Sequence, residues 1–282
     1  MIEIIGRSVE IKGQKQFILN WLGNKYLESK QQFSDYDFSK VKTVIEPFSG
    51  GIGFSRFLYE DKDLKNINYV FYDADENLLD FYKHLQKIDI DKFVEKYNKI
   101  NDYFEKNFVL KHDNRGGYSP ILDNKKIRKY INDGKIKDKY LEYLVNNNFI
   151  VQTIFNRPVP KTNLYWNDLI KKATFINVKI EDVDFSKYDK KTTLIYLDPP
   201  YGTFKGEYKE EKTPDIMYEK MLELFATFPC LLVHEENEKI EKLFKKYKFF
   251  QFDKLYHLKK KTKQQIVYAN KKFKSLVKKK NI

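Results

Sequence analysis

An apolar run that stops at an acidic residue and two prolines is the strongest structural signal in this sequence. The run spans residues 194–197, and Asp198, Pro199 and Pro200 follow it. Proline has no N–H group and disfavours helical geometry in the residue before it, so we predict a buried strand that ends abruptly. Open α/β sheets bind their ligands at the carboxyl ends of such strands. We therefore expect Asp198 at the rim of an active site.

A glycine-rich segment near the start of the chain has a related organisation. Residues 43–46 are predicted to form a strand, 47–53 a turn, and 54–59 the helix that follows. Glycines let the backbone approach a ligand closely, and the N-terminus of the next helix favours polar or anionic groups. The spacing differs from the Gly-x-Gly-x-x-Gly pattern, which disfavours a nicotinamide cofactor. A tight strand–helix turn without a ligand is the alternative.

Together the two segments resemble the DNA amino-methyltransferases, in the order found in the Dam-like (α-order) adenine-N6 methyltransferases. The family's catalytic motif is Asp/Asn/Ser-Pro-Pro-Tyr/Phe/Trp, and its cofactor loop is Glu-Pro-Phe-x-Gly-Gly-x-Gly. The resemblance implies an α/β fold, a Rossmann-like methyltransferase sheet with helices on both faces, and S-adenosyl-L-methionine as cofactor. It implies a catalytic set of Asp198, Pro199, Pro200 and Tyr201. It implies cofactor binding by Asp198 and by Glu46, Pro47, Phe48, Ser49, Gly50, Gly51 and Gly53.

An acidic segment downstream of the glycine-rich loop extends the resemblance. Asp73 ends the apolar stretch 69–72, about 20 residues after the loop, where Rossmann-like folds place an acid on the ribose hydroxyls. Asp73 matches the family's ribose-binding acid. The alternative is a helix N-cap, a role for which Asp75 is also a candidate.

Two shorter matches complete the predicted cofactor site. Trp21 and Lys25 resemble the N-terminal Trp-x-Gly-Gly-Lys motif, although Asn24 replaces its second glycine. The resemblance places this lysine beside the cofactor and the target base. Asp182 and Val183 resemble the family's Asp-Phe element, which binds the cofactor adenine. Asp184 is an alternative for the acid, and solvated loop charge is the alternative for both.

The segment between the two motifs is too long to be an ordinary connection. About 145 residues separate Gly53 from Asp198, whereas α/β connections usually take a few. We predict a discontinuous catalytic domain, residues 1–87 and 174–282, with an inserted, mainly helical domain at 88–173. Helical patterning is centred on 93–108 and 125–143. The resemblance implies that the inserted domain recognises the target sequence.

Two polar stretches in this insertion supply candidate DNA-binding residues. Arginine and asparagine pair bidentately with the edges of guanine and adenine. The candidates are Arg115 in the stretch 112–118 and Asn156, Arg157 and Lys161 in the stretch 155–163. Ordinary surface turns are the alternative. The second stretch lacks the glycine found in the corresponding family loop, so no recognition sequence follows from it.

Charge and cysteine content limit the remaining choices. The 282-residue chain carries a formal net charge of +13, which favours a polyanionic partner such as double-stranded DNA. Abundant lysine and asparagine also fit AT-rich codons, so part of this charge reflects genome composition. One cysteine provides neither a disulfide framework nor a cysteine-based metal site, and we predict no metal. No long apolar segment or signal peptide is evident, so we expect no membrane association and a cytoplasmic, soluble protein.

The resemblance favours adenine N6 as the methyl acceptor, because serine is more usual than aspartate in cytosine-N4 enzymes. It implies that Asp198 and the Pro199 carbonyl accept the two N6 hydrogens while Tyr201 stacks on a flipped-out base. The alternatives are cytosine-N4 DNA or RNA adenine methylation, or a non-catalytic DNA-binding protein. Cys230 begins a predicted strand, so a cytosine-C5-type catalytic cysteine is disfavoured. A monomer is favoured, and a cognate restriction endonuclease is a candidate partner.

Overall fold

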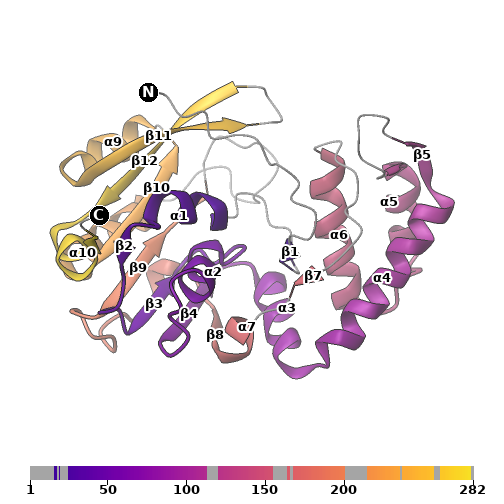
Figure 1. The fold of residues 1–282 in the computed structure, drawn as a ribbon, viewed down its shortest axis with the longest axis horizontal. Coiled ribbons are helices and arrows are strands. Elements are labelled where there is room, and N and C mark those ends of the chain that lie inside the picture. Colours follow the sequence, from indigo (N-terminus) through magenta and orange to yellow (C-terminus); the bar gives the residue numbers. More distant parts are fainter. Residues whose placement is uncertain are drawn as a thin grey trace. The chain divides into compact units, whose positions relative to one another are not determined.

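The computed structural model describes residues 16–17, 19, 25–112, 120–154, 164–165, 168–200, 215–235, 237–256 and 261–280. The chain divides into two compact units, which Figure 1 shows as a ribbon. The sheet unit comprises Met1–Arg7, Asn24–Leu79 and Lys172–Ile282, and the helical unit comprises Ser8–Gly23 and Asp80–Lys171. The predicted division at 88–173, with its assignment of target recognition, stays a prediction.

A seven-stranded, mostly parallel sheet forms the centre of the sheet unit. Its strand order is β11-β12-β10-β9-β3-β4-β8. The parallel strands are β3 (Thr43–Glu46), β4 (Asn68–Asp73), β8 (Thr174–Asn177), β9 (Thr193–Leu197) and β10 (Cys230–Glu235). An antiparallel hairpin, β11 (Lys248–Tyr256) and β12 (Lys261–Ala269), completes one edge. The predicted α/β class is confirmed at this level.

The order of the strands reverses between β3 and β9. From β3 the chain builds outward through β4 to β8, then returns to place β9 on the other side of β3. The register pairs Ile45 with Ile195, so the two strands end at nearly the same height. Open α/β sheets bind ligands outside the carboxyl ends of the strands at such a switch point. The sheet therefore directs a ligand to the residues that follow Glu46 and Leu197.

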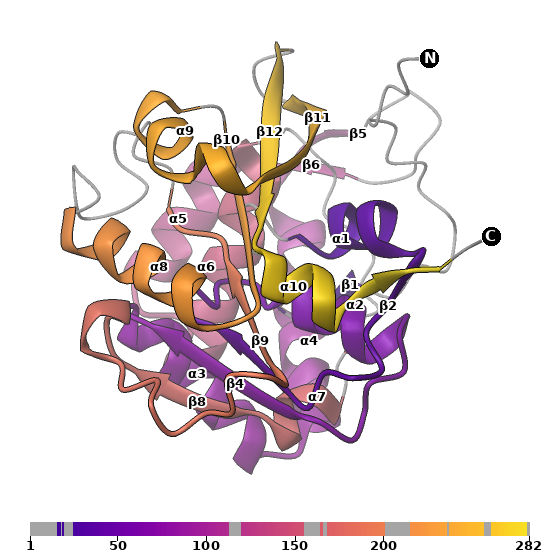
Figure 2. The ribbon, with the colours of Figure 1, turned by 90° about the vertical axis from the view of Figure 1, so that its left-hand side faces the viewer.

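Helices cover both faces of this sheet (Figure 2). On one face lie α1 (Tyr26–Phe33) and α2 (Gly53–Glu60), and on the other α8 (Asp215–Thr227) and α9 (Glu238–Phe244). Phe54 of α2 stacks on Tyr196 of β9, with ring centroids 4.1 Å apart. Met221 and Phe225 of α8 pack in the apolar core on the opposite face. Burial of such rings and thioethers is the main stabilising contribution to a core of this kind.

The remaining elements of the sheet unit are short. The 3₁₀ turns η1 (Ile180–Asp182) and η2 (Lys245–Tyr247) follow β8 and α9, respectively. The two-stranded ladder of β2 (Tyr36–Asp37) and β13 (Lys278–Lys279) joins distant parts of the chain, and α10 (Lys271–Leu276) precedes β13. Helix α9 therefore passes directly into 3₁₀ geometry after Phe244.

The described part of the helical unit contains long helices and small two-stranded ladders. Its helices are α4 (Ile90–Asn107), α5 (Asn124–Asn132), α6 (Lys139–Ile154) and α7 (Asp168–Lys172). Helix α3 (Glu76–Lys87) begins in the sheet unit and continues into this one. The ladders are the hairpin of β5 (Val109–His112) with β6 (Pro120–Leu122) and the parallel pair of β1 (Gln16–Phe17) with β7 (Leu164–Tyr165).

The helical pattern predicted over 125–143 is interrupted in the structure. Helix α5 ends at Asn132 and α6 begins at Lys139. Gly134 between them has a φ of +64°, a left-handed conformation that glycine adopts without a Cβ clash. Asp138 then accepts hydrogen bonds from the backbone N–H groups of Tyr140 and Leu141, which starts the second helix. The pair Asp133-Gly134 is a turn signal in the sequence, which the prediction of one continuous helical pattern did not use.

A buried asparagine connects the sheet to α8 and α10. The Asn270 side-chain oxygen accepts the N–H of Phe273 at 2.8 Å and that of Cys230 at 3.2 Å. Its amide nitrogen donates to the carbonyls of Phe225 at 2.7 Å and Phe228 at 2.5 Å. Because Asn270 is only 3% exposed, water cannot replace these bonds when the side chain is removed.

Replacing Asn270 with alanine is expected to lower the free energy of unfolding by about 3–5 kcal/mol, because four buried partners lose their hydrogen bonds. Asn237→Ala is the matched control, since Asn237 caps α9 from a partly exposed position and its loss should cost about 1 kcal/mol. Urea denaturation of both variants measures the difference. Equal losses would show that Asn270 acts as an ordinary cap.

Candidate active site

A lysine and an aspartate form an ion pair at the carboxyl end of β9. The distance from Lys25 Nζ to Asp198 Oδ1 is 3.3 Å, with the Lys25 side chain 3% exposed and that of Asp198 21% exposed. Glu28 Oε2, on the first turn of α1, lies 3.9 Å from the same Nζ. A buried ammonium group is unfavourable unless acids compensate it. These two carboxylates provide that compensation, and the pairing holds Asp198 in place.

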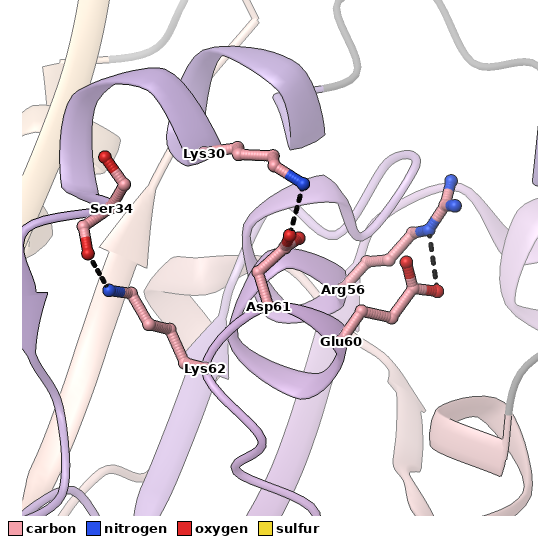
Figure 3. Close-up of polar contacts among 6 residues, drawn as sticks. All are labelled: Lys30, Ser34, Arg56, Glu60, Asp61 and Lys62. Atoms are coloured by element: carbon pink, nitrogen blue, oxygen red, sulfur yellow. Dashed lines mark hydrogen bonds and ion pairs between the residues drawn. The ribbon is translucent and has the colours of Figure 1, made fainter. Parts of the chain in front are cut away.

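Polar contacts across α1 and the end of α2 support the position of Lys25, which immediately precedes α1 (Figure 3). Lys30 Nζ on α1 contacts Asp61 Oδ1 at 2.5 Å. Lys62 Nζ donates to the carbonyl of Ser34, just beyond α1. Exposed contacts of this kind each contribute little stability, about 0–1 kcal/mol. Their importance here is the orientation that they give to α1.

Arg56 adds a more buried contact between the same two helices. Its Nε donates to Glu60 Oε1 at 3.0 Å within α2 (Figure 3). Its guanidinium carbon lies 4.2 Å from the ring centroid of Tyr26, the first residue of α1. This stacking fixes the turn that begins directly after Lys25.

Glu46 ends β3 and is buried near the ion pair. Its side chain is 2% exposed, and its Oε1 accepts the N–H of Ser55 at 2.8 Å from the first turn of α2. Burial raises the pKa of Glu46 from its ordinary value of 4.5 to about 8, and the charge of Asp198 acts in the same direction. Glu46 is therefore mainly protonated at neutral pH and adds little negative charge beside the ion pair of Lys25 and Asp198.

The glycine-rich loop follows Glu46 and folds back toward the end of β4. The hydroxyl of Ser49 and the N–H of Gly50 both donate to Asp73 Oδ2, each at 3.2 Å. Gly50 and Ile52 adopt left-handed φ angles of +42° and +46°. That conformation is unfavourable for a β-branched residue such as isoleucine, and backbone strain of this kind is concentrated at functional sites.

The two acids at the end of β4 have separate roles. Asp73 Oδ1 accepts the N–H of Asp75 at 3.0 Å while its other oxygen faces the glycine-rich loop, and burial raises its pKa. Asp75 Oδ1 accepts the N–H of Leu78 at 3.2 Å and so caps α3. The N-cap alternative thus applies to Asp75 and leaves Asp73 oriented toward the loop.

The Asp182–Val183 segment follows the carboxyl end of β8, the neighbour of β4. Asp182 is exposed at the end of η1, whereas the Val183 side chain is buried in the core cluster with Phe185. Of the two predicted residues, Asp182 presents its side chain to solvent and Val183 does not. Asp184, the alternative acid, accepts the N–H of Ser186, which lowers its pKa.

The sheet brings together most of the described cofactor-site residues. Glu46 and Asp73 end the adjacent strands β3 and β4, and Asp198 directly follows β9. Lys25 joins this edge through its ion pair with Asp198. Pro199 and Pro200 follow Asp198 in the described chain. Outside the described residues lie Trp21, Tyr201, Arg115, Asn156, Arg157 and Lys161.

Two polar residues at the end of β10 were missed by the sequence predictions. His234 and Glu235 are 3% and 5% exposed, and β10 runs parallel to β9 with Leu232 opposite Leu197. Burial lowers the pKa of His234, and the charge of Lys25 contributes in the same direction. The available signal was an apolar strand ending in polar residues, the same pattern that identified Asp198.

Cys230 lies at the opposite, amino-terminal end of β10. Its side chain is fully buried in the core, and burial raises the pKa of its thiol well above the ordinary value. Its backbone pairs with Ile195, three residues before Asp198. A thiol in this position is inert, which agrees with the rejection of a catalytic cysteine.

Substituting Glu46 with glutamine is expected to change the pH dependence of stability. Because the pKa of this acid is higher in the folded protein, folding becomes less favourable as the pH rises from about 4.5 to about 8. The amide retains an acceptor for the Ser55 N–H but cannot ionise. The melting temperature of Glu46→Gln should therefore exceed that of the parent protein by a margin that grows toward pH 8–9.

The control for this experiment is Glu219→Gln, the same chemical change at an exposed position of α8. Its thermal stability should follow that of the parent protein across the pH range. A Glu46→Gln curve parallel to the parent curve would show that Glu46 titrates normally.

Comparison with known proteins identifies the class to which this site belongs. A family model described as "D12 class N6 adenine-specific DNA methyltransferase" matches residues 21–263, which include every element of the site described above. The chain belongs to this family of enzymes, whose reaction is methylation of adenine N6 in DNA. The predicted family and reaction are confirmed by this match.

Individual relatives cover the chain to very different extents. The chain is 25% identical over 253 residues to the Type II methyltransferase M.CviBI of Paramecium bursaria Chlorella virus NC1A, covering 86% of this chain and 91% of that protein. It is 30% identical over 139 residues to merozoite surface protein 1 of Plasmodium falciparum (isolate K1 / Thailand), covering 45% of this chain. This chain spans only 8% of the length of that surface protein, so the likeness carries no argument about function.

Among the helices in the described ranges, none has both the length and the apolar character that crossing a bilayer requires.

Proposed function

We propose that this protein transfers a methyl group from S-adenosyl-L-methionine to N6 of adenine in double-stranded DNA, at the carboxyl ends of β3 and β9. The observation that carries the proposal is the ion pair of Lys25 and Asp198 at the switch point of the sheet. Family membership supports adenine N6 over cytosine N4 and over a non-catalytic role. The methyl donor, the residue roles and the DNA contacts rest on the chemistry of the site.

The residues around the glycine-rich loop fit S-adenosyl-L-methionine. Asp73 already accepts hydrogen bonds from Ser49 and Gly50, and the same carboxylate suits ribose hydroxyls. The segment Glu46–Gly53 would hold the methionine end of the cofactor, and exposed Asp182 would contact its adenine. When bound, the cofactor supplies a methyl group activated by a positively charged sulfur.

Asp198 and Pro199 are placed to activate the amine of the target base. The N6 lone pair of adenine is delocalised into the ring, which makes the amine a weak nucleophile. The Asp198 carboxylate and the Pro199 carbonyl would each accept one N6 hydrogen, which favours a tetrahedral nitrogen with an available lone pair. Lys25 holds the carboxylate in position through the 3.3 Å ion pair. The contribution of the protein is therefore positioning and electrostatics.

The substrate must supply an unstacked base, because N6 inside a duplex cannot reach a pocket at the edge of a sheet. We propose that Tyr201 stacks on the flipped adenine. The inserted segment 88–173 is proposed to recognise the target sequence through Arg115, Asn156, Arg157 and Lys161.

The relative M.CviBI is named a Type II methyltransferase. We therefore propose a restriction–modification role for this protein, with a cognate endonuclease as its partner. We propose that the protein acts as a monomer in the cytoplasm, because one copy of the sheet edge supplies all the residues assigned to the reaction.

Substituting Asp198 with alanine is expected to reduce the rate of methyl transfer by at least about a hundredfold, because one of the two acceptors for N6 hydrogens is lost. Binding of S-adenosyl-L-methionine should be retained within a few-fold, because the segment Glu46–Gly53, Asp73 and Asp182 are proposed to supply most of its contacts. Incorporation of labelled methyl groups into unmethylated duplex DNA measures the rate. Asp189→Ala, at an exposed acid before the amino-terminal end of β9, is the control. Full activity in Asp198→Ala would overturn the assigned role.

Replacing Lys25 with methionine tests whether the ion pair orients the carboxylate. The apolar stem is kept while the charge that pairs with Asp198 is removed, so the catalytic rate constant should fall by about tenfold or more. Lys65→Met makes the same change at a lysine that is 52% exposed, in the loop between α2 and β4, and should leave the rate unchanged. A Lys25→Met enzyme with an unchanged rate constant and a raised KM would instead assign Lys25 to substrate binding alone.

A further inference from the structure

Helix α5 of the helical unit presents a face made of cations. Ile127 and Ile131 are buried, and Lys125, Arg128 and Lys129 are all exposed. These three cations follow an i, i+3, i+4 pattern, which places them on one face of the helix, opposite the buried isoleucines. Within the described residues, the carboxylate that pairs with this face is that of Asp133, 3.0 Å from Lys129.

The charge on α5 is not explained by the lysine-rich composition of the chain. Helix α4 in the same unit has four lysines and four acidic residues, and two of its exposed lysines pair with acids, Lys99 with Glu95 at 2.7 Å and Lys92 with Asp89 at 3.5 Å. Helix α5 has four cations in nine residues and no acidic residue. A general bias toward lysine codons would affect both helices alike.

The arrangement is also unfavourable for the helix by itself. Like charges at i, i+3 and i, i+4 repel, and Lys125 and Lys126 occupy the first turn, where the helix dipole disfavours cations. The helix has no acidic residue in that turn, whereas α4 has Asp91 there. A partner that carries closely spaced negative charges would remove this repulsion.

We infer that the face of α5 formed by Lys125, Arg128 and Lys129 contacts the phosphate backbone of duplex DNA. This inference deepens the proposed function, on which it rests, by naming a surface that positions the DNA without reading its bases. Lysine suits this task because it acts as a compact point charge rather than a bidentate reader of base edges. Duplex DNA presents about one negative charge per 1.7 Å of axis, so a compact cationic face meets several phosphates.

The start of α5 is fixed to the neighbouring hairpin. Asp123 caps the helix by accepting the N–H groups of Lys125 and Lys126, and its own N–H donates to the carbonyl of Phe108 at 2.7 Å, beside β5. The cationic face is therefore anchored to the hairpin β5–β6 that precedes it in the chain. A rigid attachment of this kind is what a DNA-positioning surface requires.

The test compares two triple variants of the full-length protein. K125Q/R128Q/K129Q removes the cationic face, and K92Q/K96Q/K106Q removes three exposed charges from α4. Glutamine has nearly the same helix propensity as lysine and arginine, so circular dichroism should show both variants folded. Binding to a fluorescent duplex of mixed sequence is measured between 50 and 200 mM salt.

The α5 variant should bind at least about tenfold more weakly at low salt. Its plot of log affinity against log salt should be shallower by about 0.9 for each phosphate that the variant no longer neutralises. The α4 variant should bind within about twofold of the parent protein, since its lysines are not assigned to the DNA-binding face.

Several outcomes would overturn the inference. Equal weakening of the two variants would assign the effect to net charge, and binding of the α5 variant as tight as that of the parent would exclude the proposed DNA contact. Binding to a single-stranded RNA of the same length would be measured in parallel. If the α5 variant lost affinity for this RNA and kept its affinity for the duplex, the face would be assigned to another partner. If the parent protein binds and methylates duplex DNA but the α5 variant has the same duplex affinity and salt dependence as the α4 control, only this inference is contradicted. A parent protein that neither binds nor methylates duplex DNA contradicts the proposed function as well.

Discussion

The active-site rim depends on the cost of burying one ammonium group. Lys25 is almost fully enclosed, so its charge is tolerated only because Asp198 lies 3.3 Å away and Glu28 lies nearby. The same requirement fixes Asp198, because a buried cation and its carboxylate hold each other in one geometry. Burial of Glu46 keeps a second carboxyl mainly neutral at the same rim. The ion pair of Lys25 and Asp198, with Glu28 nearby, therefore lies at the place where the sheet changes direction.

The fold explains why these residues meet although they are distant in sequence. Glu46 and Asp198 end neighbouring parallel strands, and Asp73 ends the next strand on the other side of β3. Lys25 comes from the segment before α1, which contacts with α2 orient. The site is thus a property of the sheet edge and of one helix packed on it. This arrangement is suited to holding a small cofactor and a single base in fixed relation.

The sequence predicted those features whose causes are local. The strand before Asp198 ends because prolines follow it, and the turn after Glu46 bends where glycines permit it, so both were located from a few residues each. Features with non-local causes were missed or misplaced. Strand β11 exists through its pairing with β12, and the polar end of β10 matters through its position beside β9. The break at Gly134 is a separate miss, because the pair Asp133-Gly134 is a local turn signal.

The most direct test of the account is the identity of the methylated base. The parent protein would be incubated with labelled S-adenosyl-L-methionine and unmethylated duplex DNA, and the digested nucleosides would be separated by mass spectrometry. The account predicts label in N6-methyldeoxyadenosine. Label in N4-methyldeoxycytidine, or no labelled nucleoside from a protein that binds the cofactor, would contradict it.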